Sequence, residues 1–99
     1  MILEVVDIRI HAGQQAAFEA ALREGIATTL SQSPGFISAR VQHGVESPER
    51  YLVFIEWRAL DDHMVGFRQG PLFQVWRTLV GPFFASPPAM EHFETVSIV

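Results

Sequence analysis

The sequence predicts an α+β domain in which four strands and two helical regions follow in the order β-α-β-β-α-β. Two segments are apolar at almost every position, which is typical of central strands, and two others alternate, which is typical of edge strands. Between the strand segments lie stretches whose apolar residues recur at helical spacing. In this ferredoxin-like order, the first and third strands are central in a four-stranded antiparallel sheet with helices on one face. The two apolar segments fall at those two places.

The first element is predicted to be a central strand and the second a helix. Residues 2–10 are rich in β-branched residues and almost continuously apolar. From residue 14 to about residue 30, apolar residues are spaced by three and four and form one helical stripe. Gly25 lies near this stripe. Because glycine costs a helix about 1 kcal/mol, we expect Gly25 to mark close packing of the helix on the sheet.

The next two strands are predicted to be neighbours joined by a short turn. Residues 36–45 alternate, with Phe36 expected on the same face as Ser38, and predict an edge strand. Residues 46–49 are polar and contain a proline, which suits a hairpin connection. Residues 51–57 are apolar on both faces and predict a central strand.

The rest of the chain is predicted to hold two short helices and a final strand. Asp61 is a good N-cap for a helix that runs to about Gln69. Pro71 suits the first position of a second helix, over residues 71–80. Residues 89–99 alternate and predict the second edge strand.

The length of 99 residues suits one domain, residues 1–99, and favours a homodimer. A chain of this size removes only roughly 60–65% of its surface from water when it folds alone. The helices of one chain can cover only one face of a four-stranded sheet, whereas the central strands are apolar on both faces. We therefore expect the sheet of a second copy to cover the other face.

Charge and missing residue types exclude several classes of function. The net charge is −4 and the seven arginines are scattered, so we expect neither a nucleic-acid nor a membrane partner. The absence of cysteine and lysine excludes thiolate and Schiff-base chemistry. No histidines or carboxylates have a convincing metal-ligand spacing, so no metal is predicted. An acidic N-terminus and the lack of a long apolar run predict a cytoplasmic protein.

A set of residues spread from the second strand to the last carries a resemblance to a known family. The set comprises Pro34-Gly35-Phe36, Tyr51 with Glu56-Trp57, His63 with Phe67, Phe73 with Trp76, Pro82-Phe83 and His92-Phe93. In this pattern, which covers about residues 2–98, the chain resembles the antibiotic biosynthesis monooxygenase (ABM) family. The resemblance implies a single ABM-like domain, a dimeric α+β barrel made by two chains, and oxygenation of quinols or aromatic polyketides without a cofactor.

The same family includes haem-degrading enzymes, and the residues typical of that branch are missing. Those enzymes resemble one another in an Asn on the first strand, a Trp on the helix after the third strand and a His one helix further on. Here the first strand has no Asn, Phe67 stands where the Trp would fall, and residues 71–80 contain no His. We therefore predict no haem and no other cofactor.

His63, Trp57 and Arg77 are the predicted catalytic residues. His63 lies at the start of a predicted helix, whose N-terminus favours a neutral imidazole that can act as base or hydrogen-bond donor. The alternative is a surface histidine beside Asp62. Trp57 would stack on an aromatic ligand or donate its indole N–H, with core packing as the alternative. Arg77 would compensate the charge of a substrate anion.

Aromatic residues are predicted to line an apolar pocket for a small aromatic molecule, although each also suits a core position. They are Phe67, Phe73, Trp76 and Phe83. Four polar residues on the strands are expected to be structural, with a pair of Arg40 and Glu56 across neighbouring strands; the alternative for an Arg that lines a pocket is to hold a phenolate or superoxide-like anion. They are Arg40, His43, Glu56 and His92. Nothing in the sequence supports a pair between His63 and His92.

The sequence is compatible with two functions. The first is a cofactor-independent monooxygenase that acts on a quinol or a polycyclic phenol, in which an electron-rich anion of the substrate reacts with oxygen. The second is a non-catalytic, small-molecule-binding or stress-associated dimer of the same fold. Polar groups that converge on a cavity wall would favour the enzyme, and a cavity filled by phenylalanines would favour the second.

Overall fold

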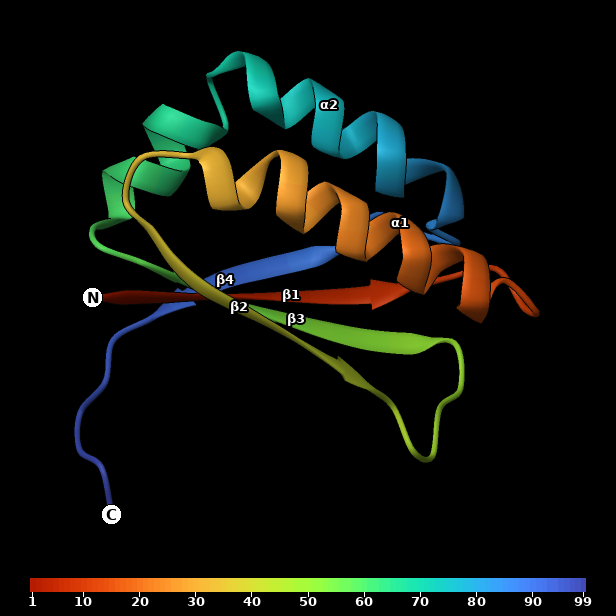
Figure 1. Cartoon of the computed structure of the whole chain (residues 1–99). Helices are drawn as coiled ribbons and strands as arrows, with labels where there is room; N and C mark the ends of the chain where they lie inside the picture. The colour runs from red at the N-terminus through yellow and green to blue at the C-terminus, as the bar shows by residue number, and fades with distance from the viewer.

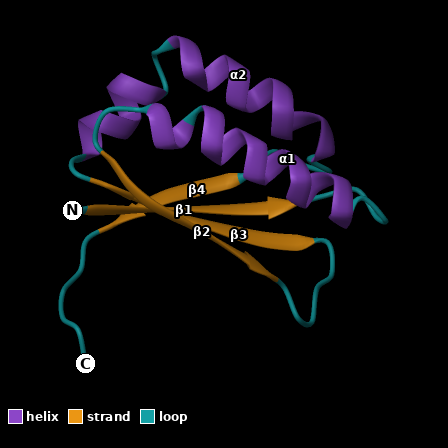
Figure 2. Cartoon of the chain, viewed as in Figure 1, coloured by secondary structure: helices purple, strands orange, loops and turns teal.

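The computed structural model describes residues 1–99 and has the predicted order of elements. These are β1 (Ile2–Arg9), α1 (Gln15–Thr28), β2 (Phe36–His43), β3 (Arg50–Trp57), a π-helical segment (Asp62–Phe67), α2 (Pro71–Val80) and β4 (Ala89–Phe93). The strands form one antiparallel sheet in the order β2-β3-β1-β4, so β1 and β3 are central, as predicted. Both helices lie on the same face of the sheet (Figures 1 and 2). The predicted ferredoxin-like fold is confirmed.

The core fills the space between the helices and the sheet. Alternation along β3 directs every second side chain from Tyr51 to Trp57 towards the helices, where all four are buried. Phe18 and Leu22 of α1 pack on them from above. The other face of the sheet has no such cover: Leu52 and Phe54 alternate with the buried residues and stay half-buried. The prediction that the central strands carry apolar residues on both faces is therefore confirmed.

The faces of β2 differ from the prediction because the strand contains a bulge. Phe36 lies opposite Trp57, but Ser38 lies opposite the next residue of β3, Glu56, so that Ile37 is an extra residue. Phe36 consequently turns towards the helices and packs edge-on against Trp57, with ring centroids 6.1 Å apart. The prediction that Phe36 shares a face with Ser38 is wrong.

Gly25 allows close packing, but against a helix rather than the sheet. A Cβ atom at this position would lie 2.8 Å from Cε3 of Trp76, a side chain of α2. The missing side chain therefore lets α1 and α2 approach each other. Residues 94–99 also differ from the prediction. They follow β4 without joining the sheet, and Val96 and Ile98 are almost fully exposed.

The helical region after β3 begins differently from the prediction. Helical backbone starts at Leu60, before Asp61, and the Asp61 side chain makes no capping hydrogen bond. The carboxylate of Asp62 instead accepts hydrogen bonds from the Ala59 N–H (3.0 Å) and the Arg58 guanidinium (2.8 Å). The wider π-helical turn follows directly and carries His63. None of the helices has the length and apolar character required to cross a membrane.

Candidate functional site

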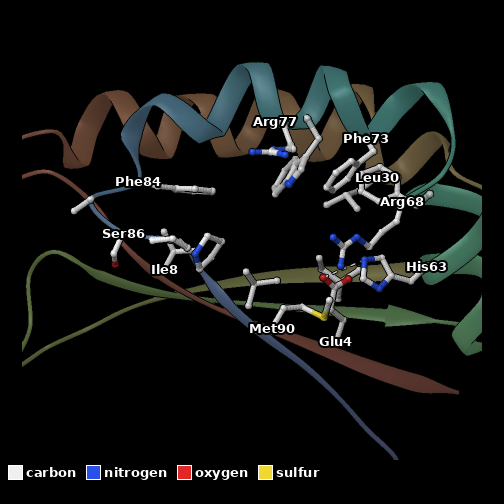
Figure 3. A pocket seen from close by; sticks show the side chains of 17 residues that line it. Glu4, Ile8, Leu30, His63, Arg68, Phe73, Arg77, Phe84, Ser86 and Met90 are labelled. Atoms are coloured by element: carbon white, nitrogen blue, oxygen red, sulfur yellow. Dashed lines mark ion pairs between the residues drawn. The ribbon is translucent and has the colours of Figure 1, made fainter.

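A cavity of about 550 Å³ lies between α2 and the sheet. Phe73, Trp76 and Arg77 of α2 form its roof, as Figure 3 shows for Phe73 and Arg77. Its floor is formed mainly by β1, and residues 84–88, which connect α2 to β4, form one wall. Most of the lining is apolar, and the size is typical of small-molecule sites.

One end of the cavity is polar. Glu4 of β1 and His63 of the π-helical segment face each other there, with Oε2 of Glu4 3.4 Å from Nε2 of His63 (Figure 3). The other carboxylate oxygen, Oε1, accepts a hydrogen bond of 2.9 Å from the indole N–H of Trp57. Nδ1 of His63 lies 2.7 Å from Nε2 of His92, on β4. Four side chains from four elements are thus connected in one network.

The fold places these side chains through strand register and ring stacking. Glu4 and His92 are paired residues of β1 and β4, on the face that the helices cover. Trp57 ends β3, and its indole stacks on the His63 imidazole at 5.3 Å between ring centroids and 23° between planes. The imidazole also stacks on the ring of Phe67, with 6.2 Å between the ring centroids. His63 is therefore held in one orientation by aromatic contacts.

Burial shifts the proton equilibria of this network. Only 5% of Glu4 is exposed, and desolvation raises its pKa to about 7, although the Trp57 hydrogen bond and the Arg68 charge act in the opposite direction. Burial also lowers the pKa of His63 to about 4, with smaller contributions from His92 and Arg68. The pKa of His92 is lowered by burial and by Arg68. Near neutral pH, both imidazoles are neutral while the Glu4 carboxyl titrates.

Two arginines supply positive charge to the cavity. Arg68 and Arg77 both line it, and neither forms an ion pair within the chain. Both guanidinium groups lie over the ring of Phe73, at 5.2 Å and 5.9 Å from its centroid. An anionic ligand in this cavity would therefore find two cations that form no ion pair, although the Arg68 charge also acts on the Glu4 carboxyl.

The structure brings most of the predicted site residues to the cavity. Those that line it are His63, Phe67, Phe73, Trp76 and Arg77. His63 is buried, so the alternative of a surface histidine is wrong. Burial is the chief cause of the lowered pKa of His63, whereas the sequence predicts a neutral imidazole from the helix N-terminus.

Trp57 and Phe83 lie away from the cavity wall. Trp57 is fully buried and uses its N–H on Glu4, so it supports the network from behind and has no free face for a ligand. Phe83 packs against Phe18 in the core, with ring centroids 5.6 Å apart. Its neighbour Phe84 lines the cavity instead.

Glu4 and Arg68 are site residues that the sequence does not predict, and His92 belongs to the site although a structural role is predicted for it. Glu4 is one of two acids in its strand, and alternation places it on the same face as Val6 and Ile8; an acid on that apolar face is the signal that could have found it. The contact between His63 and His92 depends on strand register, which residue types do not encode. The expected pair of Arg40 and Glu56 does not form. Arg40 lies over the ring of Phe54, and Glu56 accepts a hydrogen bond from Ser38.

No group of three or more potential ligands in the structure is arranged to hold a metal ion. The facing nitrogens of His63 and His92 are at hydrogen-bond distance from each other, which leaves no room for a cation between them.

The fold and the site define a class: a small ferredoxin-like α+β domain with a mostly apolar cavity that ends in a buried network of titratable groups. Comparison with known proteins supports this class. The sequence pattern of the family described as "antibiotic biosynthesis monooxygenase" matches residues 1–79. The uncharacterized protein YczJ of Bacillus subtilis is 33% identical over 96 residues, which cover 97% of this chain and 100% of YczJ. The chain therefore belongs to the antibiotic biosynthesis monooxygenase family.

Solved structures agree with this assignment. An antibiotic biosynthesis monooxygenase-like protein of Bordetella bronchiseptica has a TM-score of 0.92 and 35% identity, with 97% of each chain covered. SnoaB, a cofactor-independent oxygenase from Streptomyces nogalater, has a TM-score of 0.84 and 18% identity, with 99% of this chain and 95% of SnoaB covered. At that identity the likeness to SnoaB is one of fold.

Proposed function

We propose that the protein is a cofactor-independent monooxygenase that oxidises a quinol or polycyclic phenol in the cavity between α2 and the sheet. The observation that carries this proposal is the buried pair of Glu4 and His63 at the polar end of an otherwise apolar cavity, beside the unpaired Arg68. The family and the fold shared with the oxygenase SnoaB support the reaction class. The cavity is open and carries converging polar groups, which favours an enzyme over a binding protein.

The proposed reaction takes its electrons from the substrate. Glu4, held by Trp57 and His63, accepts a proton from a phenol or from the ring CH₂ of its keto tautomer. Arg68 stabilises the resulting anion. The electron-rich carbon bonds to O₂, the peroxide takes the proton back, and loss of water leaves a ring carbonyl. One oxygen atom ends in the product and one in water, so that no external reductant is required.

The other predicted residues have supporting parts in this proposal. Arg77 compensates charge at the roof of the cavity, and Phe67, Phe73 and Trp76 contact the aromatic rings. His63 positions and polarises Glu4 as a neutral imidazole. Trp57 contributes through its hydrogen bond to Glu4 rather than through contact with the ligand.

Oxygen consumption tests the proposal. A panel of anthrones and naphthohydroquinones, assayed with an oxygen electrode and no added flavin or metal, should show uptake that depends on the protein. ¹⁸O₂ should place one labelled atom in the product, and added catalase should release no oxygen because no hydrogen peroxide forms. Quenching of Trp76 fluorescence by a phenol without any oxygen uptake would contradict the enzyme and support the non-catalytic alternative.

We also propose that the protein works as a homodimer in which two sheets pack face to face. The uncovered face of β1 and β3 carries half-buried apolar residues, and Phe93 of β4 on the same face is 47% exposed. Membership of the family supports a dimer. Light scattering should give twice the chain mass of 11.1 kDa. Phe54→Lys should convert the dimer to a monomer, whereas a wild-type monomer at micromolar concentration would contradict the proposal.

A further inference from the structure

His92 takes no part in the cavity wall, yet it completes a line of three titratable groups. Glu4 lines the cavity, His63 follows at 3.4 Å, and His92 follows at 2.7 Å on the edge strand β4. Glu4 and His63 are buried, whereas His92 is partly exposed. The line therefore runs from the polar end of the cavity to the edge strand of the sheet.

Hydrogen-bond donors and acceptors in this line can be assigned from its two ends. Trp57 can only donate, so Oε1 of Glu4 accepts, and Oε2 is the atom that faces His63. When Glu4 is ionised, the 3.4 Å contact between Oε2 and Nε2 of His63 is attractive only if Nε2 carries its proton. Nδ1 of His63 is then an acceptor, and Nε2 of His92 must donate to it. Nδ1 of His92 is left without a proton.

The assignment reverses when the Glu4 carboxyl is protonated. The carboxyl O–H then donates to Nε2 of His63, so His63 carries its proton on Nδ1 and donates to Nε2 of His92. Nδ1 of His92 now bears the remaining proton. The two arrangements differ by one proton in total, and both imidazoles are neutral in each.

We propose that Glu4 exchanges its proton with solvent through His63 and His92, with Nδ1 of His92 as the outer end of the relay. One proton arrives at His92 Nδ1, one passes from His92 Nε2 to His63 Nδ1, and one passes from His63 Nε2 to Oε2 of Glu4. Three bonds to hydrogen form and, apart from the donor in solvent, two break, so that one proton is gained and Glu4 becomes neutral. The reverse sequence restores the carboxylate. The relay would return the Glu4 carboxylate to its ionised form after each turnover, and this role rests on the proposed function.

The surroundings favour this route over charged histidines. The groups that face the line are Trp57 from β3, which is not charged, and Arg68, the cation that follows the π-helical segment. Arg77 of α2 is a second cation in the same cavity. Positive charge nearby and burial both disfavour an imidazolium, so a proton that enters the line ends on the carboxyl.

The relay predicts that both histidines change tautomer together, which two-bond ¹H–¹⁵N correlations can detect in the ligand-free protein. At about pH 8.5, where Glu4 is ionised, His63 and His92 should both be Nε2–H tautomers. As the pH falls below about 7, the pKa of Glu4, both should convert to Nδ1–H with one shared midpoint.

A Glu4→Gln variant should lock the relay in one arrangement. Trp57 holds the amide oxygen, so the amide NH₂ faces Nε2 of His63 and forces both histidines into the Nδ1–H tautomer at every pH where they are neutral. Glu56→Gln, on the same sheet but on its uncovered face, is the matched control and should keep the wild-type switch. If Glu4→Gln fails to fold, the tautomer switch of the wild-type protein still tests the relay.

The outcomes separate the relay from the proposed function. Opposite tautomers on the two histidines at about pH 8.5, or separate midpoints for them, would overturn the relay whatever the oxygen assay shows. A coupled tautomer switch in a protein that consumes no oxygen would keep the relay and refute only the monooxygenase.

Discussion

Two clusters at opposite ends of β3 are built from the same kinds of side chain. At one end, the Trp57 N–H donates to Glu4, and His63 stacks on the indole. At the other end, the Tyr51 O–H donates to Glu19 at 2.6 Å, and His43 stacks on the phenol ring at 4.5 Å. Each cluster combines a carboxylate, an aromatic donor from β3 and a histidine.

The two clusters differ in their contact with water. Glu19 has a side chain that is 36% exposed and lies 3.8 Å from Arg23, and His43 uses its Nε2 on the Pro48 carbonyl. In that cluster the pKa that moves is that of Tyr51, which burial and Glu19 raise above its ordinary range. In the Glu4 cluster, burial raises the pKa of the carboxyl group itself. Residue types alone therefore do not make a reactive site, because exposure to solvent determines which group has its pKa shifted.

The largest expected effect is on turnover. His63→Gln should lower protein-dependent oxygen uptake by about 10²–10⁴-fold, because Glu4 loses the imidazole that polarises it during proton transfer. His43→Gln is the matched change in the other cluster and should leave uptake unaltered. Equal losses in the two variants, measured with the same phenol, would show that the two clusters do not differ in function.

The second effect is on the pH dependence of stability. The folded-state pKa of Glu4, about 7, is above its ordinary value of 4.5, so between these values the folded chain binds more protons than the unfolded chain. The contribution of Glu4 to the free energy of unfolding must then fall as the pH rises through this interval, by roughly 3 kcal/mol relative to Glu4→Gln. Urea unfolding from about pH 5 to 8 measures this difference. A Glu4→Gln curve that runs parallel to the wild-type curve would refute the shift.

The third effect compares the two aromatic donors. Trp57→Phe leaves a buried acceptor with one partner fewer and removes ring volume, so it should cost about 2–3 kcal/mol of stability. Tyr51→Phe removes a hydrogen bond whose acceptor can turn to water and should cost about 1 kcal/mol. Thermal or urea unfolding of both variants gives the comparison. A larger loss for Tyr51→Phe would reverse the ranking of the clusters.

The sequence contains enough information for the fold, and less for the site. Mostly apolar runs at residues 2–10 and 51–57 predict the central strands, because a strand with apolar neighbours on both faces has few places for polar residues. The bulge at Ile37 could not be predicted, since it depends on how two strands align rather than on either strand alone. The same limit explains the pair of His63 and His92, which are 29 residues apart in the chain.

Trp57, one of the predicted site residues that the structure places away from the cavity wall, shows a second limit. Trp57 and Trp76 are both aromatic residues next to the predicted pocket, and the sequence does not say which ring faces the cavity. The structure places Trp76 on the wall and Trp57 behind it, because alternation along β3 directs Trp57 under the π-helical segment. The positions of Phe73 and Arg77 can be predicted from helical spacing, since one face of α2 must cover the sheet.

The short last strand has a consequence for motion. β4 contains five residues, pairs with β1 alone, and is followed by residues 94–99 outside the sheet. Such an edge opens locally at a lower free energy than the central strands, and its amide hydrogens should exchange with solvent first. Met90 and His92 belong to this strand, one in the cavity wall and the other at the end of the proton line. Local opening of β4 would therefore widen the cavity and interrupt the proton line in the same event.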